Sequence, residues 1–342
     1  MRTTKMINDP TAIVPEMLEG FAAAYSETIR YEDGLIVRAT PKTAGNVGLV
    51  IGNGSGHEPA MIGWVGPGLF DVNVPGPIFT APGPSKLVSG MKVADRGAGV
   101  LLCVSNHSGD VLNAELALED LEEEDGIDVD VVILYDDVAS APKGHEDERR
   151  GSAGLFFVWK IVGAFAETGA TLQECKAMAE RVRDNTRTLS ATLGNCAHPV
   201  SGEAIGEIAE GQMAVGVGVH GESGGGTIKV PSADVAVDLL MSSLLDDLPF
   251  HAGDEVCVLV NNGGSMTLME LSILYRRIAQ LLEGRGVGVH RAWLGPYATT
   301  QDSAAFAIAL CRVDTQLKDL YDAPAIGGSV QFGSPFGVGE TA

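Results

Sequence analysis

The sequence predicts an α/β protein with two domains, each built on a mainly parallel sheet flanked by helices. Short apolar runs rich in β-branched residues recur along the chain, and segments with helical spacing of apolar residues lie between them. The chain has 342 residues, which is the usual size of about two domains. Its 44 glycines cluster at the ends of apolar runs, where they favour tight turns.

Four apolar runs are predicted to be strands, at 48–51, 99–104, 129–134 and 256–260. Each is almost continuously apolar instead of alternating, which is typical of strands covered on both faces. The helices expected between them have apolar residues three or four positions apart and span 112–124, 171–184, 232–248 and 268–282. The second of these opens with a capping box, Thr171 and Glu174. Alternating strands and helices indicate layered, largely parallel sheets.

The domain boundary is predicted near residue 190, because the stretch 191–211 has little periodicity. The N-terminal domain then spans residues 1–190 and the C-terminal domain spans 191–325. The tail, 326–342, is rich in Gly and Ser and has no helical period. We expect it to be frayed or to lie as an irregular arm on the surface.

Composition excludes several classes of function. The 45 acidic and 23 basic residues give a formal charge of −22, and such a surface repels nucleic acids and anionic lipids. The five cysteines form no C-x-x-C pair, so they predict neither a zinc site nor a redox motif. The N-terminus has no apolar signal core, and Gly and Pro interrupt the long uncharged stretches. We therefore expect a soluble, cytoplasmic protein that binds neither nucleic acid nor membrane.

Three predicted turns carry polar residues where ligands bind in open α/β sheets, beyond the carboxyl ends of strands. The first turn, 52–59, has glycines at alternate positions followed by His57 and Glu58. Glycine lets the backbone approach a ligand closely and point N–H groups into a concavity. The alternative is a glycine-rich turn with a capping histidine.

The second turn, 105–110, ends in Asp110 just before a predicted helix. As a functional group, Asp110 is a general base for a small polar substrate, with Asn106 and the turn amides as hydrogen-bond partners. The alternative is a helix N-cap.

The third turn, 216–222, places His220 among glycines at the end of a strand-like segment. An unprotonated imidazole nitrogen there is a nucleophile as well as a base. The alternative is a packed histidine whose ring nitrogens are satisfied.

These turns together resemble the dihydroxyacetone kinase family, specifically its substrate-binding K subunit or K domain. The motifs are Gly-Asn-Gly-Ser-Gly-His-Glu-Pro at 52–59, Asn-His-Ser-Gly-Asp-Val-Leu-Asn at 106–113 and Gly-Val-Gly-Val-His-Gly-Glu at 216–222. Further similar segments lie at 136–138, 150–154, 160–163, 268–271 and 294–300. The similar segments follow one another in the same order as in the family over residues 10 to 325, and their combination is highly specific for this family.

The resemblance implies roles for the residues already singled out. His220 would add to the ketone carbonyl of a short ketose such as dihydroxyacetone and hold it as a covalent hemiaminal. Asp110 would take the proton from the terminal hydroxyl that attacks phosphorus, and His57 would hydrogen-bond the substrate. The implied substrate-binding residues are Gly54, Ser55, Gly56, Ser105 and Asn106.

The resemblance also implies what this chain lacks. In the family a separate L domain or subunit holds the nucleotide, so Mg-ATP or Mg-ADP is expected on an L-type partner and no cofactor or metal on this chain. The K-type chain is expected to be a homodimer and to be inactive as a kinase alone. The sequence leaves open whether ATP or a phosphotransferase relay supplies the phosphoryl group.

Several positions depart from the family pattern. Ser105 stands where a lysine that contacts substrate is common, and His107 and Ser108 replace an aromatic residue and a threonine. The segment after His220 reads Gly-Glu-Ser-Gly instead of Gly-Glu-Pro-Gly. Replacing a long cation by a hydroxyl leaves room, which favours erythrulose or another short ketose larger than dihydroxyacetone. A second alternative is a ketose-binding sensor or co-regulator that does not turn over its ligand.

Overall fold

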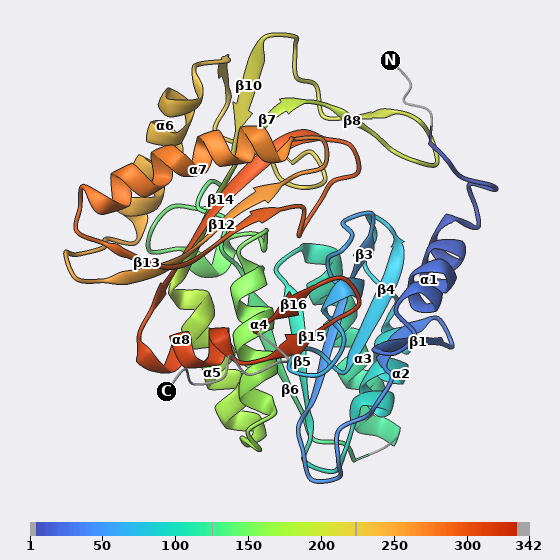
Figure 1. Ribbon diagram of the computed structural model, residues 1–342. Helices are drawn as coiled ribbons and strands as arrows, with labels where there is room; N and C mark the ends of the chain where they lie inside the picture. The colour runs from blue at the N-terminus through green and yellow to red at the C-terminus, as the bar shows by residue number, and fades with distance from the viewer. Residues whose placement is uncertain (1–4, 125, 223, 334–342) are drawn as a thin grey trace.

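The structure, a computed structural model, describes residues 5–124, 126–222 and 224–333. Two six-stranded sheets form the framework, the first in the lower right and the second in the upper half of Figure 1. The expected class, α/β with helices flanking the sheets, is confirmed. The helices are α1 Ile13–Ala24, α2 Pro84–Ala94, α3 Ser108–Glu124, α4 Leu155–Ala166, α5 Leu172–Asp184, α6 Ala233–Asp247, α7 Leu268–Glu283 and α8 Thr315–Asp322, with short 3₁₀ turns at Ile62–Trp64 and Glu146–Glu148.

The first sheet has the strand order β1-β2-β4-β3-β5-β6. Its strands are β1 Ile29–Glu32, β2 Leu35–Arg38, β3 Gly48–Ser55, β4 Val72–Ile78, β5 Val100–Ser105 and β6 Val129–Leu134. The pairs from β4 through β3 and β5 to β6 are parallel. Strands β3 and β5 are buried along their whole length, because helices cover both faces. Val50 and Leu102 pack under α2 and α3, whereas Ile51 and Cys103 join the core beside α4 and α5.

The second sheet has the order β11-β10-β7-β14-β12-β13 and is mixed. Its strands are β7 Thr186–Gly194, β10 Gln212–Val215, β11 Thr227–Lys229, β12 Glu255–Asn262, β13 Gly288–Gly295 and β14 Ala304–Val313. The expected parallel arrangement holds for β12 and β13, which α7 connects. Strand β14 instead pairs antiparallel with both β12 and β7. Helices α6 and α7 cover the outer face, and the inner face shares one core with α4 and the first sheet.

The segment expected as an irregular arm is partly ordered. Strands β15 Ala325–Ile326 and β16 Gln331–Phe332 form a small antiparallel pair, as do β8 Cys196–Ala197 and β9 Ala204–Ile205 elsewhere. Phe332 is buried against Trp293, with ring centres 4.6 Å apart. The segment is ordered because the Phe332 ring is buried. The Gly- and Ser-rich composition around Phe332 does not predict this contact. The rest of that tail, 334–342, lies outside the described residues.

Two further observations concern the cysteines and the helices. All five cysteines are buried and unpaired, as expected for small hydrophobic side chains. In the described part of the chain, no helix has the length and apolar character needed to cross a membrane.

Candidate active site

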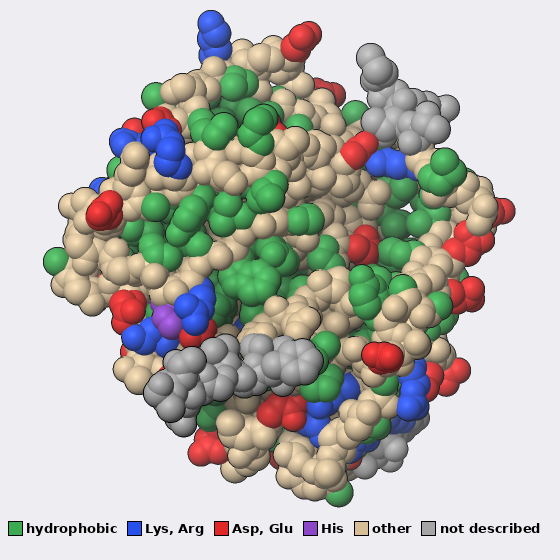
Figure 2. All heavy atoms as spheres, in the orientation of Figure 1, with side chains coloured by type: hydrophobic (Ala, Val, Ile, Leu, Met, Phe, Trp, Pro, Cys, Tyr) green, Lys and Arg blue, Asp and Glu red, His purple; other side chains and the backbone are tan. Residues whose placement is uncertain are grey.

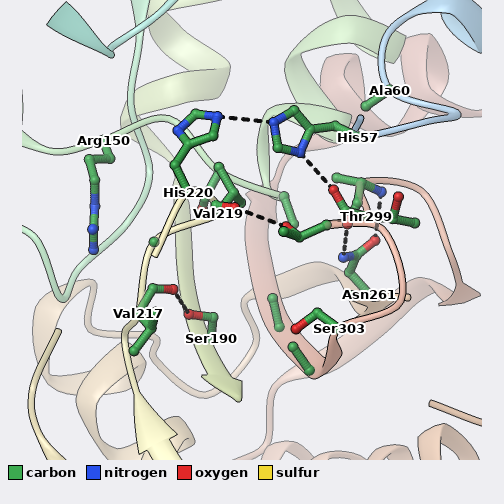
Figure 3. A pocket seen from close by; sticks show the side chains of 18 of the residues that line it. His57, Ala60, Arg150, Ser190, Val217, Val219, His220, Asn261, Thr299 and Ser303 are labelled. Atoms are coloured by element: carbon green, nitrogen blue, oxygen red, sulfur yellow. Dashed lines mark hydrogen bonds between the residues drawn. The ribbon is translucent and has the colours of Figure 1, made fainter. Parts of the chain in front are cut away.

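A cavity of about 130 Å³ lies between the two sheets, at the carboxyl ends of the first sheet's parallel strands. The three turns singled out in the sequence converge there, since His57, Asp110 and His220 all line it. The first sheet contributes His57 and Asp110 from the segments that follow β3 and β5. The second sheet contributes His220 from the loop after β10 (Figure 3).

His57 and His220 face each other across the cavity. Their Nε2 atoms are 3.1 Å apart, and Nδ1 of His57 lies 2.7 Å from the carbonyl oxygen of Thr299 (Figure 3). That carbonyl only accepts hydrogen bonds, so it assigns the proton of a neutral His57 to Nδ1 and leaves a lone pair on Nε2. Burial, followed by the nearby His220, lowers the pKa of His57 to about 3. His57 is therefore neutral at physiological pH and can accept a proton at Nε2.

Glu222 orients the ring of His220. Its carboxylate accepts a hydrogen bond from the backbone N–H of His220 at 2.9 Å and lies 3.2 Å from Nδ1 of the same residue. The carboxylate favours a proton on Nδ1 of His220, so Nε2 is the nitrogen that can act as a nucleophile once it gives up its contact with Nε2 of His57. Burial raises the pKa of Glu222, but its contacts with His107 and His220 outweigh burial and hold the pKa below the ordinary value. The pair is a carboxylate-oriented imidazole, the arrangement of an activated nucleophile.

Asp110 lies inside the first turn of α3, which begins at Ser108, instead of just ahead of the helix. Oδ1 of Asp110 is buried without a hydrogen-bond partner in the described part of the chain. Burial raises the pKa of this carboxyl group to about 6, against the opposing effects of His107 and His220. A carboxyl group that lines a cavity and has a pKa close to the working pH is suited to general-base chemistry.

The residues predicted to bind substrate divide into two groups. Gly54 and Ser105 line the cavity. Ser55, Gly56 and Asn106 are not among the lining residues. The polar groups of all three form hydrogen bonds with other groups of the protein. The Ser55 hydroxyl donates to Gly76 O at 2.7 Å, and the Gly56 N–H donates to the Glu58 carboxylate at 2.8 Å. Asn106 donates to the backbone oxygens of Asp147 and Arg149.

Three side chains around the cavity had no role assigned from the sequence. Arg150 donates to the Asp137 carboxylate and to Gly216 O, which fixes the start of the loop that carries His220. Asn261 bonds the backbone of Tyr297 and Ala298, next to the Thr299 that orients His57 (Figure 3). Arg150 and Asn261 are distant in sequence from what they hold, so only the fold reveals them. Glu222 stands two positions after His220, and this short spacing could have predicted that its carboxylate contacts the His220 ring.

Among the described residues, one group of three side chains brings possible metal-ligand atoms close together: His107, His220 and Glu222. Each offers one ligand atom within 4.8 Å of the other two, and imidazole with carboxylate suits zinc-like ions. The same atoms already contact one another, because Glu222 lies 3.2 Å from His220 and 3.6 Å from His107. A cation there would replace the contact that orients His220.

Comparison with known proteins identifies the family. The Dak1 domain family matches residues 19–327. The chain belongs to the Dak1 domain family. It is 37% identical over 323 residues to the dihydroxyacetone-binding subunit of a PTS-dependent dihydroxyacetone kinase from Listeria innocua, covering 94% of this chain and 97% of that one. The resemblance stated from the sequence is thereby confirmed.

Two other Dak1 relatives differ in their named roles. An L-erythrulose kinase from Pectobacterium atrosepticum is 36% identical, and the match covers 97% of this chain but 57% of that protein. A solved structure of a dihydroxyacetone kinase operon co-activator is 29% identical with a TM-score of 0.85, covering 92% of this chain and 96% of that one. The proteins similar to this chain therefore include kinases and a protein named for regulation.

Proposed function

We propose that this Dak1 chain is the substrate-binding subunit of a ketose kinase. The observation that carries the proposal is the hydrogen-bond contact of 3.1 Å between Nε2 of His220 and Nε2 of His57, in a cavity that Asp110 also lines. A nucleophile, a proton acceptor and a base thus surround one small space. This set fits a substrate with both a carbonyl and a hydroxyl group.

In the proposed binding step, Nε2 of His220 adds to the ketone carbon, and the carbonyl π electrons move to oxygen. The proton that the cationic imidazole releases returns to this oxygen, so no proton is gained or lost overall. Glu222 stabilises the transient imidazolium through its contact with Nδ1. His57, neutral and within reach, serves the proton movement at the new hydroxyl. Alcohols such as glycerol have no carbonyl and cannot form this adduct.

In the proposed transfer step, Asp110 removes the proton from a terminal hydroxyl as that oxygen attacks phosphorus. Phosphoryl transfer also needs a nucleotide and Mg²⁺, and the sequence contains no P-loop motif. We propose that an L-type partner subunit brings Mg-ATP or Mg-ADP, and that this chain alone does not phosphorylate.

We also propose a homodimer, with the outer face of α6 and α7 as the interface. Leu268, Met269 and Val235 are each more than half exposed there, and Figure 2 shows hydrophobic side chains gathered on the face that α7 crosses. Exposed apolar groups at this density favour burial against another surface.

The proposed substrate is dihydroxyacetone or a slightly longer ketose such as erythrulose. Ser105 lines the cavity with a short side chain, and on the side of the second sheet the lining includes the small residues Ser190, Ala305 and Ala307. The relatives named for dihydroxyacetone and for L-erythrulose support this range. A ketose-binding co-activator is the second candidate, which the co-activator relative favours. The free oxygen of Asp110 speaks against it, because binding alone needs no base.

Intact-mass spectrometry under gentle ionisation tests the binding step. We expect dihydroxyacetone and erythrulose to add their whole mass to the wild-type chain, and glycerol to add nothing. His220→Ala should abolish the adduct, whereas His251→Ala, which alters an exposed histidine far along the chain, should keep it. An adduct that persists in His220→Ala, or none with any ketose, would overturn the proposal.

Asp110→Asn separates kinase from sensor. Because the general base contributes about 10²- to 10⁴-fold, we expect phosphorylation in the presence of an L-type subunit and Mg-ATP to fall by that factor while the ketose adduct remains. If wild-type and Asp110→Asn chains bind ketose equally and neither supports phosphorylation with any L-type partner, the co-activator role is the better description.

A further inference from the structure

His107 is a third histidine of the cavity, and the proposed chemistry leaves it without a role. It lies between the end of β5 and the start of α3, and its side chain is 15% exposed. Its ring centre is 5.2 Å from that of His220, in an edge-to-face arrangement. It thus stands beside the nucleophile and one helical turn before the base.

Both ring nitrogens of His107 face oxygen atoms that accept hydrogen bonds. Nε2 lies 3.0 Å from the carbonyl oxygen of Gly151, and Nδ1 lies 3.6 Å from Oε1 of Glu222. A neutral imidazole has one N–H group and one lone pair, so it would direct a lone pair at one of these oxygens. An imidazolium has two N–H groups and suits both.

The charges around His107 also favour a cation. Glu222 faces it from the loop after β10, and the negative charge of Asp110, three residues further along the chain on α3, favours the cation as well. Arg150 is the nearest arginine to Glu222, at 4.0 Å, but its guanidinium is committed to Asp137 and Gly216 O. His220 contacts the same carboxylate through Nδ1, and His57 lies beyond it. Burial lowers the pKa of His107, but Glu222, Gly151 O and Asp110 outweigh burial and raise it.

We propose that His107 is an imidazolium that acts as the counter-ion of Asp110 and Glu222 and keeps Asp110 ionised for its task as a base. The role of Asp110 in this statement rests on the proposed function. His107 is then a positioning residue that acts through the base, and it gives the cavity a positive charge that Ser105 does not supply.

The charge state is measured directly by nitrogen-15 NMR of the histidine side chains in the full chain, without ketose or partner. We expect both ring nitrogens of His107 to be protonated at pH 7, with His107→Gln used to assign its signals. A neutral His107 at pH 7 would overturn the proposal. This result is independent of the proposed function, which would fail separately if the wild-type chain formed no ketose adduct.

The effect on the base is measured by the pH dependence of phosphorylation with the L-type partner. Losing a cation near Asp110 should raise its pKa by about one unit. The acidic limb of His107→Gln should therefore move up by about one pH unit, with a rate about fivefold lower at pH 6 and nearly unchanged at pH 8. His107→Lys should restore the limb, and His145→Gln, at an exposed histidine paired with Glu148, should leave it in place. An unchanged limb in His107→Gln, with a wild-type melting temperature, would contradict the counter-ion role.

Discussion

The turns that carry His57 and His220 are built differently. His57 follows β3, whose eight residues are all buried in the parallel centre of the first sheet. His220 follows β10, a four-residue strand buried at only two positions, and its loop is held by polar contacts to Arg150, Glu222 and Ser190. The packed strand and hydrogen bonds with the Thr299 backbone therefore fix the proton acceptor, whereas polar side chains fix the nucleophile. The geometry of His220 should be the more sensitive of the two to the loss of one polar side chain.

Removing Arg150, which holds the His220 loop, should cause the largest loss of stability. In Arg150→Ala the nearly buried Asp137 carboxylate loses its cation and Gly216 O loses its donor. Breaking a buried ion pair on one side costs about 3–5 kcal/mol. We expect the free energy of unfolding in urea to fall by about that amount and the ketose adduct on His220 to weaken.

The control is Arg276→Ala, because Arg276 and Asp234 form an ion pair in which both side chains are about half exposed. Such surface pairs contribute about 0–1 kcal/mol. If both arginine variants lost the same stability, the charge contacts at the His220 loop would not be what holds it.

A disturbance of the packed turn should be smaller. Gly56 has φ = +105°, and a Cβ atom there would lie 2.7 Å from the ring of Phe79, which itself packs on His57 with ring centres 5.1 Å apart. Gly56→Ala should cost about 1–3 kcal/mol through backbone strain and this contact. Gly45→Ala is the matched control, since Gly45 also has a positive φ, +85°, but open space around it. Urea unfolding of both variants isolates the Phe79 contact; equal losses would mean that the ring simply moves away.

The same contrast explains what the sequence could predict. The runs at 48–51 and 99–104 mark β3 and β5, because continuous burial leaves a direct mark on composition. The run at 129–134 is β6, although only two of its six residues are buried. Strand β14 was not predicted, and its antiparallel direction depends on pairing with β7, more than a hundred residues away. The turns of His57 and Asp110 meet because β3 and β5 are neighbouring parallel strands that end at one edge, whereas the turn of His220 follows β10 of the other sheet. The contacts of Arg150 with Gly216 and of His107 with Glu222 join segments that are distant in the sequence, so no local sequence pattern predicts them.

The smallest expected effect compares two serine hydroxyls, one in each region. The Ser55 hydroxyl donates to Gly76 O at 2.7 Å inside the first sheet, and the Ser190 hydroxyl donates to Val217 O at 3.0 Å beside the cavity. Either alanine variant should lose about 1 kcal/mol of stability, the ordinary value of one such hydrogen bond. Their effects on ketose binding should differ, because Val217 belongs to the loop of His220 and β3 is held by packing.

We therefore expect Ser190→Ala to weaken the ketose adduct severalfold and Ser55→Ala to leave it unchanged, as measured by adduct mass against ketose concentration. A tenfold loss of binding in Ser55→Ala would instead restore the substrate contact predicted for Ser55 from the sequence. It would also mean that β3 shifts when the ketose binds, since the hydroxyl now points to Gly76 and away from the cavity lining. The first sheet would then be the adaptable wall of the site, and the polar loop of His220 the fixed one.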